Sequence, residues 1–210
     1  MRKLHFNPTR ERKPMPGCVQ DFMARVDGDE KAAELGQLAS DKLDSSELHR
    51  LCLHFANGVH YTCRQFNVAP QRISFVDYID DKGDGHSANG PLPRYEDFAH
   101  MACYAPDTKE IFISRSWMQY MLQHPEETYP VGMNGQHMVG REDMAFLAGA
   151  HETFHHAQEH GGSRARRKGT VTLSYKDFDY DQDPLENEAW KYELQVAQDV
   201  GIVPKQRGRR

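Results

Sequence analysis

The decapeptide AHETFHHAQE, residues 150–159, contains the spacing on which the expected fold depends. His151 and His155 are four residues apart, so on a helix both imidazoles lie on one face and can bind a single ion. Glu152 directly follows the first histidine, where its carboxylate can reach a water molecule bound to that ion. The segment H-E-x-x-H therefore predicts a helix that carries a metal site.

The preceding residues, REDMAFLAGA at 141–150, have the composition of a helix opening. Acidic side chains occupy its first turn, where they interact favourably with the helix dipole. Apolar residues then recur at the spacing of one helix face, and the histidines continue that face: Met144, Leu147, Ala148, His151 and His155. The pattern predicts a helix whose apolar stripe runs into the metal ligands.

A catalytic zinc site typically has three protein ligands and one open position for water. Zinc lowers the pKa of that water from about 16 to roughly 7, so a neighbouring carboxylate can remove its proton at neutral pH. We therefore expect His151 and His155 as Zn²⁺ ligands, Glu152 as general base, and a third ligand elsewhere in the chain.

A second helix with a carboxylate in its first turn is expected after residue 183. Asp183 is a good N-cap, Pro184 suits the first helical position, and Glu186 falls three residues after the cap. An apolar stripe continues the helix through Leu185, Ala189, Tyr192 and Val196.

The identity of the third ligand stays open at this point. Glu188 lies roughly 200° around the helix from Glu186, so the two cannot share one face. Glu186 can also serve as a capping-box carboxylate that accepts from backbone N–H groups. His160 is a further candidate, although it falls five residues after His155, whereas the metzincin pattern needs six and a turning glycine. His156 points about 100° away from His155, which favours a substrate contact or a surface position.

The layout resembles the gluzincin metallopeptidases, in which an H-E-x-x-H helix is followed about thirty residues later by a glutamate-bearing helix. The segment DPLENEA, residues 183–189, is similar to the E-x-E-A segment that supplies the last ligand in several of these families. The order of expected elements over residues 100–198 resembles the small metallopeptidases that cleave phage and mobile-element repressors. Residues 155–158, HHAQ, are similar to the H-x-x-Q continuation of a second group of predicted bacterial metallopeptidases.

This resemblance implies a zinc metallopeptidase with Glu186 as the third ligand. Many relatives have Asp or Asn just after the alanine, where this chain has Trp190, so the usual partner of a ligand histidine is not identified. A Tyr or His often stabilises the oxyanion in such enzymes, and Tyr175, Tyr180 and His160 are the candidates by position. An exposed sheet edge typically aligns the substrate, and the expected strand 110–114 is the candidate edge.

The remaining pattern predicts a mostly helical α+β fold with a small antiparallel sheet beside the H-E-x-x-H helix, a zincin-like arrangement. Residues 1–17 are expected to form a flexible basic arm, 18–204 a single domain (helical scaffold 18–70, core 71–200), and 205–210 a basic tail. Within the domain, helices are expected at 19–26, 30–39, 46–66 and 117–123, and strands at 72–79, 100–104, 110–114 and 171–175. Residues 129–140 show no regular period and are expected to form a loop.

Composition limits the functional classes. The net charge of the 210 residues is -5, which gives no global reason to expect nucleic acid or an anionic membrane as partner, and no apolar run approaches the ~20 residues of a membrane helix. The basic N-terminus lacks the apolar core of a secretory signal. The four cysteines form no C-x-x-C pair, and Cys52 and Cys63 share a helix face, so we expect buried reduced thiols and a cytoplasmic protein.

The sequence therefore predicts a zinc-dependent hydrolase that cleaves peptide bonds in a protein or peptide substrate. One alternative is a protein in which a closed zinc site only stabilises a binding surface. The other is a nucleic-acid-associated factor that uses the basic runs 164–168 and 207–210 to contact phosphates.

Overall fold

The computed structural model describes residues 15–27, 45–80, 82–88, 92, 94, 100–132, 135, 137–160 and 183–205. Several expected features lie outside these residues. They are the helix at 30–39, the strand at 171–175, both basic runs, most of the N-terminal arm and nearly all of the basic tail. Tyr175 and Tyr180 do as well.

The helices begin and end close to where local signals place them. They are α1 (Gly17–Asp27), α3 (Ser45–Phe66), α4 (Arg115–Gln123), α5 (Arg141–His160) and α7 (Pro184–Val200). Asp183 caps α7 by accepting from the N–H of Leu185, and Ser114 caps α4 by accepting from that of Trp117. These contacts satisfy backbone donors that the first turn of a helix leaves without partners.

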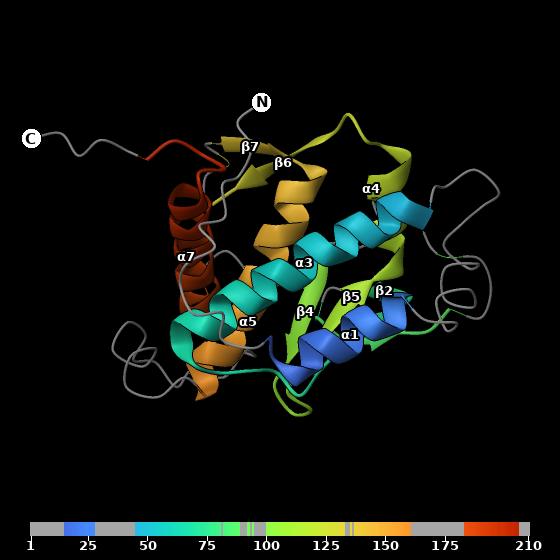
Figure 1. The fold of residues 1–210 in the computed structure, drawn as a ribbon, viewed down its shortest axis with the longest axis horizontal. Coiled ribbons are helices and arrows are strands. Elements are labelled where there is room, and N and C mark those ends of the chain that lie inside the picture. Colours follow the sequence, from blue (N-terminus) through green and yellow to red (C-terminus); the bar gives the residue numbers. More distant parts are fainter. Residues whose placement is uncertain are drawn as a thin grey trace, which may run out of the picture.

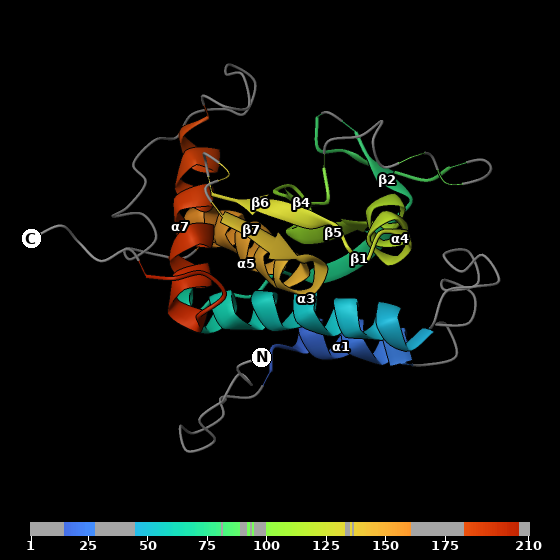
Figure 2. The ribbon, with the colours of Figure 1, turned by 90° about the horizontal axis from the view of Figure 1, so that it is seen from above.

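Helices α3 and α5 lie side by side in backbone contact (Figure 2). A Cβ at Gly58 would lie 1.9 Å from the carbonyl oxygen of Phe146, and one at Gly149 would lie 2.2 Å from that of Phe55. Only glycine permits this approach at either position, because real Cβ atoms essentially never come within 3.0 Å of another heavy atom. The long helix α3 is thereby fixed directly against α5, the helix that carries the histidines.

The main sheet has the strand order β1-β5-β4, formed by β1 (Arg72–Val76), β5 (Glu110–Ser114) and β4 (Ala102–Ala105). Strand β4 pairs with β5 as an antiparallel hairpin, as expected, whereas β1 pairs with β5 in parallel. The sheet is therefore mixed rather than purely antiparallel. Strand β5 is central, so the prediction that it forms the exposed edge is wrong: both of its hydrogen-bonding sides are occupied.

The predicted single strand at 72–79 is divided at Asp77. After β1, the residues of β2 (Tyr78–Ile79) pair with β3 (Gly85–His86) in a separate small sheet. The buried carboxylate of Asp77 accepts from Arg115 at 2.6 Å and from the N–H of Ala88 at 2.7 Å. These bonds hold the chain at the point where it leaves the main sheet.

The expected loop at 129–140 contains a hairpin instead. Strand β6 (Thr128–Val131) pairs antiparallel with β7 (His137–Gly140). Along β6, Tyr129 and Val131 are buried while Thr128 and Pro130 are exposed, which is the alternation of a half-buried strand. Gly132 and Gly135 adopt positive φ angles in the connection. The hairpin packs against α5.

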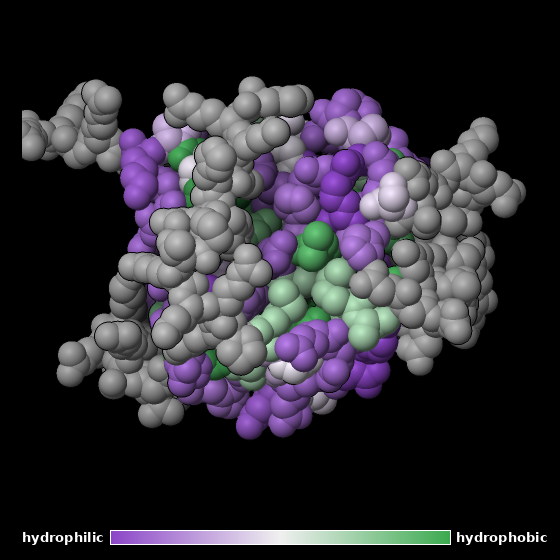
Figure 3. Space-filling model, viewed as in Figure 1, coloured by the Kyte–Doolittle hydropathy of each residue, from purple (hydrophilic) through white to green (hydrophobic). Residues whose placement is uncertain are grey.

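One cluster of buried apolar residues extends from Cys18 on α1 to Val203 after α7. Figure 1 shows α3 crossing in front of α5 and the sheet, with α7 standing at one side. The face formed by α1 and α3 is mostly hydrophilic, with a band of hydrophobic residues near its middle (Figure 3). Helix α3 carries the exposed apolar side chain of Leu53. Helices thus pack against small sheets around a shared core, and the predicted α+β class is confirmed.

Candidate metal centre

Helix α5 brings His151 and His155 together as their spacing predicts. Both side chains are buried, their Nε2 atoms are 3.1 Å apart, and the ring centroids are separated by 4.9 Å. One turn of helix separates the two Cα positions, so the imidazoles project from the same face. Burial at this position follows from the apolar stripe of α5, which places the same face against the core.

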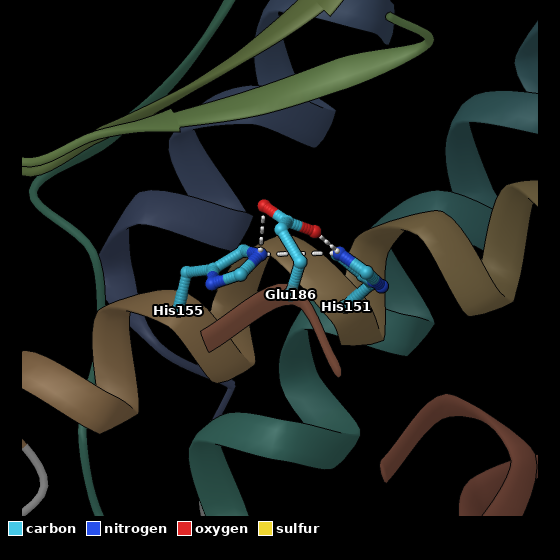
Figure 4. A group of neighbouring side chains, drawn as sticks. All are labelled: His151, His155 and Glu186. Carbon is cyan, nitrogen blue, oxygen red and sulfur yellow. Dashed lines mark hydrogen bonds and ion pairs between the residues drawn. The ribbon is translucent and has the colours of Figure 1, made fainter. Parts of the chain in front are cut away.

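Glu186 completes the group from the first turn of α7. Its Oε2 lies 3.3 Å from Nε2 of His151, and its Oε1 lies 3.2 Å from Nε2 of His155 (Figure 4). Among the described residues, these three have ligand atoms that all lie within 4.8 Å of one another, and we call them the metal group. Two atoms about 2.0–2.1 Å from one tetrahedral ion are themselves about 3.3 Å apart. The observed separations therefore fit a shared tetrahedral cation.

The local sequence explains why Glu186 is available. Asp183 accepts from the first backbone donor of α7, and Glu186 turns inward with only 8% of its surface exposed. Glu188 lies on another face of α7 and does not join the group. His160 also stays outside it, because it is exposed at the end of α5 and pairs with Glu159 at 3.3 Å.

Glu193 holds the first histidine, a role that the sequence interpretation missed. Its Oε2 lies 3.2 Å from Nδ1 of His151, and its Oε1 accepts from the backbone N–H of Gly132 at 3.3 Å. A carboxylate can only accept, so Nδ1 of His151 carries the proton and Nε2 is directed at Glu186. Glu193 is seven residues after Glu186, two helical turns further along the same face of α7, and that spacing was the available signal.

Gln158 holds the second histidine in the same manner. Its Oε1 lies 2.9 Å from Nδ1 of His155, and its Nε2 donates to the carbonyl oxygen of Leu185 at 3.2 Å. The amide oxygen can only accept, so His155 also presents Nε2 to the group. Because Leu185 immediately precedes Glu186, Gln158 joins the end of α5 to the turn that supplies the third ligand.

The three residues form a strongly coupled charged cluster. Burial alone would raise the pKa of the Glu186 carboxyl, but the adjacent imidazoles, His155 first, hold that pKa well below its usual range. Burial would lower the pKa of His151, but hydrogen bonds to Glu186 and Glu193 raise it well above its usual value. Burial would also lower the pKa of His155, but the charge of Glu186, its hydrogen bond to the ring and the charge of Glu152 together raise it. This environment favours positive charge between the rings, and a divalent cation would supply such a charge.

Glu152 lies beside the group without joining it. Its Oε2 accepts from the backbone N–H of Tyr104 at 2.8 Å, so the carboxylate bridges α5 and the outer side of β4. A cavity of about 300 Å³ opens next to it, lined in part by His151, Glu152 and Glu193. Glu152 therefore lies next to His151 but outside the group of three candidate ligands.

His156 is buried, so its interpretation as a surface residue is wrong. Its Nδ1 lies 3.0 Å from the hydroxyl of Tyr104, and its ring packs edge-on against the Tyr104 ring. Burial lowers the pKa of His156 to about 4, which keeps the imidazole neutral at physiological pH. The Tyr104 hydroxyl donates to Glu159 at 3.1 Å, so these contacts connect α5 to β4.

No family model matches the chain, and neither a curated protein nor a solved structure matches it.

Proposed function

We propose that this protein is a zinc-dependent hydrolase that cleaves peptide bonds. The observation that carries the proposal is the convergence of three buried ligands, His151, His155 and Glu186, beside a fourth residue, Glu152, that faces a cavity. Two histidines and one glutamate form a donor set of catalytic zinc sites, which retain an open position for water.

The chain's own residues would each perform one part of the reaction. His151, His155 and Glu186 would hold the ion, and Glu193 and Gln158 keep both imidazoles presenting Nε2. When bound, zinc lowers the pKa of a coordinated water to about 7 and polarises the scissile carbonyl. Glu152 would accept the water proton and donate it to the departing amine, so that its carboxylate is regenerated after each turnover.

Strand β4 replaces β5 as the proposed guide for an extended substrate. It is the strand of the main sheet that lies next to α5, and its Tyr104 N–H points to Glu152 rather than to β5. Ala102, which has the same orientation along the strand, lines the cavity. Because the Tyr104 N–H is already donated to Glu152, a peptide backbone added along this side would pair with β4 near Ala102, beside the cavity that His151 and Glu152 line.

The described residues do not favour the two competing functions. A zinc ion that only stabilises the fold needs a closed tetrahedron, whereas the group found in the described ranges has three members. The basic runs that would contact nucleic acid lie outside those ranges. Among the described helices, none has the length and apolar character to cross a membrane. A cytoplasmic location is part of the proposal, supported by four cysteines that are all free thiols.

Replacement of Glu152 tests the proposal. We expect Glu152→Gln to bind one zinc ion per chain as the unchanged protein does, and to lose at least about 100-fold in peptide hydrolysis, since the amide cannot accept the proton. The matched control is Glu142→Gln in the first turn of the same helix, where the partly exposed carboxylate pairs with Arg50 at 2.8 Å and is outside the group of candidate ligands. The control should keep full activity. A fully active Glu152→Gln protein would refute the assigned role.

A further inference from the structure

We infer that the cavity beside the metal group binds a bulky apolar side chain of the peptide substrate, preferably an aromatic one, with Trp190 as its recognition surface. This inference rests on the proposed function and assigns its substrate class. The substrate residue concerned would be adjacent to the cleaved bond, because the cavity is lined at one end by His151 and Glu152.

The walls of the cavity come from four separate parts of the fold. Helix α5 contributes Met144 and Ala148, two turns and one turn before Glu152 respectively, and both are at least 90% buried. Helix α7 contributes Trp190, the first residue of β4 and the two residues before it contribute Ala102, Met101 and His100, and the β6–β7 hairpin contributes Pro130. The hydrogen bond from Gly132 to Glu193 fixes that hairpin to α7, so the hairpin side of the cavity is anchored.

Size and chemistry select the class of side chain. The volume is about 300 Å³, and an apolar protein cavity of about 150 Å³ already accepts benzene. A phenylalanine or leucine side chain can therefore enter, together with part of its backbone. The charged groups at the metal end include the carboxylates of Glu152 and Glu193, which would repel an acidic substrate side chain.

Trp190 lies on α7 three residues before Glu193, so the two residues occupy neighbouring parts of one helix surface. Glu193 contacts His151, and the cavity beside that contact is lined by Trp190. Its ring offers an offset-stacked or edge-on contact to an aromatic substrate side chain, which a purely aliphatic wall cannot provide.

The test uses the zinc-loaded full chain and internally quenched peptides that differ at one residue on either side of the cleaved bond. On one of the two sides, kcat/KM should follow the order Phe, Leu, Gly, Glu, with Phe exceeding Gly by at least about 10-fold. Trp190→Ala should reduce the Phe-to-Gly ratio by at least about 3-fold, and Trp190→Phe should retain part of it. Met138→Ala, an exposed apolar residue of β7, is the control and should leave the ratio unchanged.

Binding provides a second readout that does not need turnover. The chain has two tryptophans, and Trp117 is fully buried in the core, so a fluorescence change on adding peptide to zinc-loaded Glu152→Gln protein reports on Trp190. The Phe peptide should give a saturable change that is absent in Glu152→Gln/Trp190→Phe. Hydrolysis with equal rates for Phe and Gly peptides, or a ratio that Trp190→Ala does not alter, would overturn the inference alone. Absence of hydrolysis of any peptide by the zinc-loaded protein would overturn the proposed function.

Discussion

Removing the carboxylate of Glu193 should weaken metal binding although Glu193 is not a ligand. It accepts from two donors, Nδ1–H of His151 and the backbone N–H of Gly132, and its side chain is buried. Glu193→Gln retains one acceptor oxygen of the same size, so one of the two donors loses its partner. Glu193→Ala removes both acceptors and leaves unfilled volume.

The magnitude follows from these contacts. An outer residue that orients a ligand histidine typically contributes 10- to 100-fold in metal affinity, or about 1.4–2.8 kcal/mol. A buried donor without a partner costs about 1–3 kcal/mol, a similar amount. We expect a loss of about 10-fold for Glu193→Gln and of up to about 100-fold for Glu193→Ala.

Zinc affinity is measured by competition with a chromophoric chelator, starting from metal-free protein. Asp199→Asn serves as the control, because Asp199 lies in the last turn of the same helix and contacts Lys205 at 3.1 Å, away from the ligands. Affinities within about 2-fold of the unchanged protein for both Glu193 variants would refute the assigned contact. A chain that binds no zinc at all would instead refute the metal site.

Two further predictions concern the scaffold. Gly149→Ala should lower the free energy of unfolding by about 2 kcal/mol. The new Cβ would lie 2.2 Å from the Phe55 carbonyl oxygen, and this overpacking costs up to about 3 kcal/mol, whereas the higher helix propensity of alanine contributes about 1 kcal/mol of stability. Urea unfolding measures this against Gly17→Ala, which has open space, and equal stability of Gly149→Ala would contradict the backbone contact. His156 has its pKa lowered from 6.5 to about 4 by burial, so its contribution to stability is complete above pH 6.5 and declines as the pH falls toward 4. NMR titration should show a neutral His156 ring at pH 5, and a midpoint above pH 6 would exclude the buried neutral form.

Local sequence signals predicted the positions of the helices, because each signal acts within one or two turns. Asp183 and Pro184 mark the start of α7, and the apolar stripe from Met144 to His155 marks the inner face of α5. The four-residue spacing of the two candidate ligands, His151 and His155, follows the same periodicity. The prediction that Glu186 faces these histidines required more, namely the resemblance in the segment 183–189, and the structure brings the three residues together.

The β structure was less predictable. Strand β6 contains Pro130 and only four residues, so its alternation of buried and exposed side chains is too short to distinguish from a loop. The pairing of β1 with β5 joins residues nearly forty positions apart, and no local property of either strand specifies it. For this reason the sequence could identify β5 as a strand but could not tell whether it was central or at an edge.

The sequence alone determined which side chains can share a helix face: His151 with His155 on α5, and Glu186 with Glu193 on α7. Helical periodicity is a property of the covalent backbone and its nearest hydrogen bonds, so it needs no tertiary contact. Only the tertiary structure decided that these two faces meet, that β4 borders them, and that Trp190 lines the cavity they enclose. Those relations depend on how close α3, α5 and α7 can pack, which is set by glycines and buried side chains distant from one another along the chain.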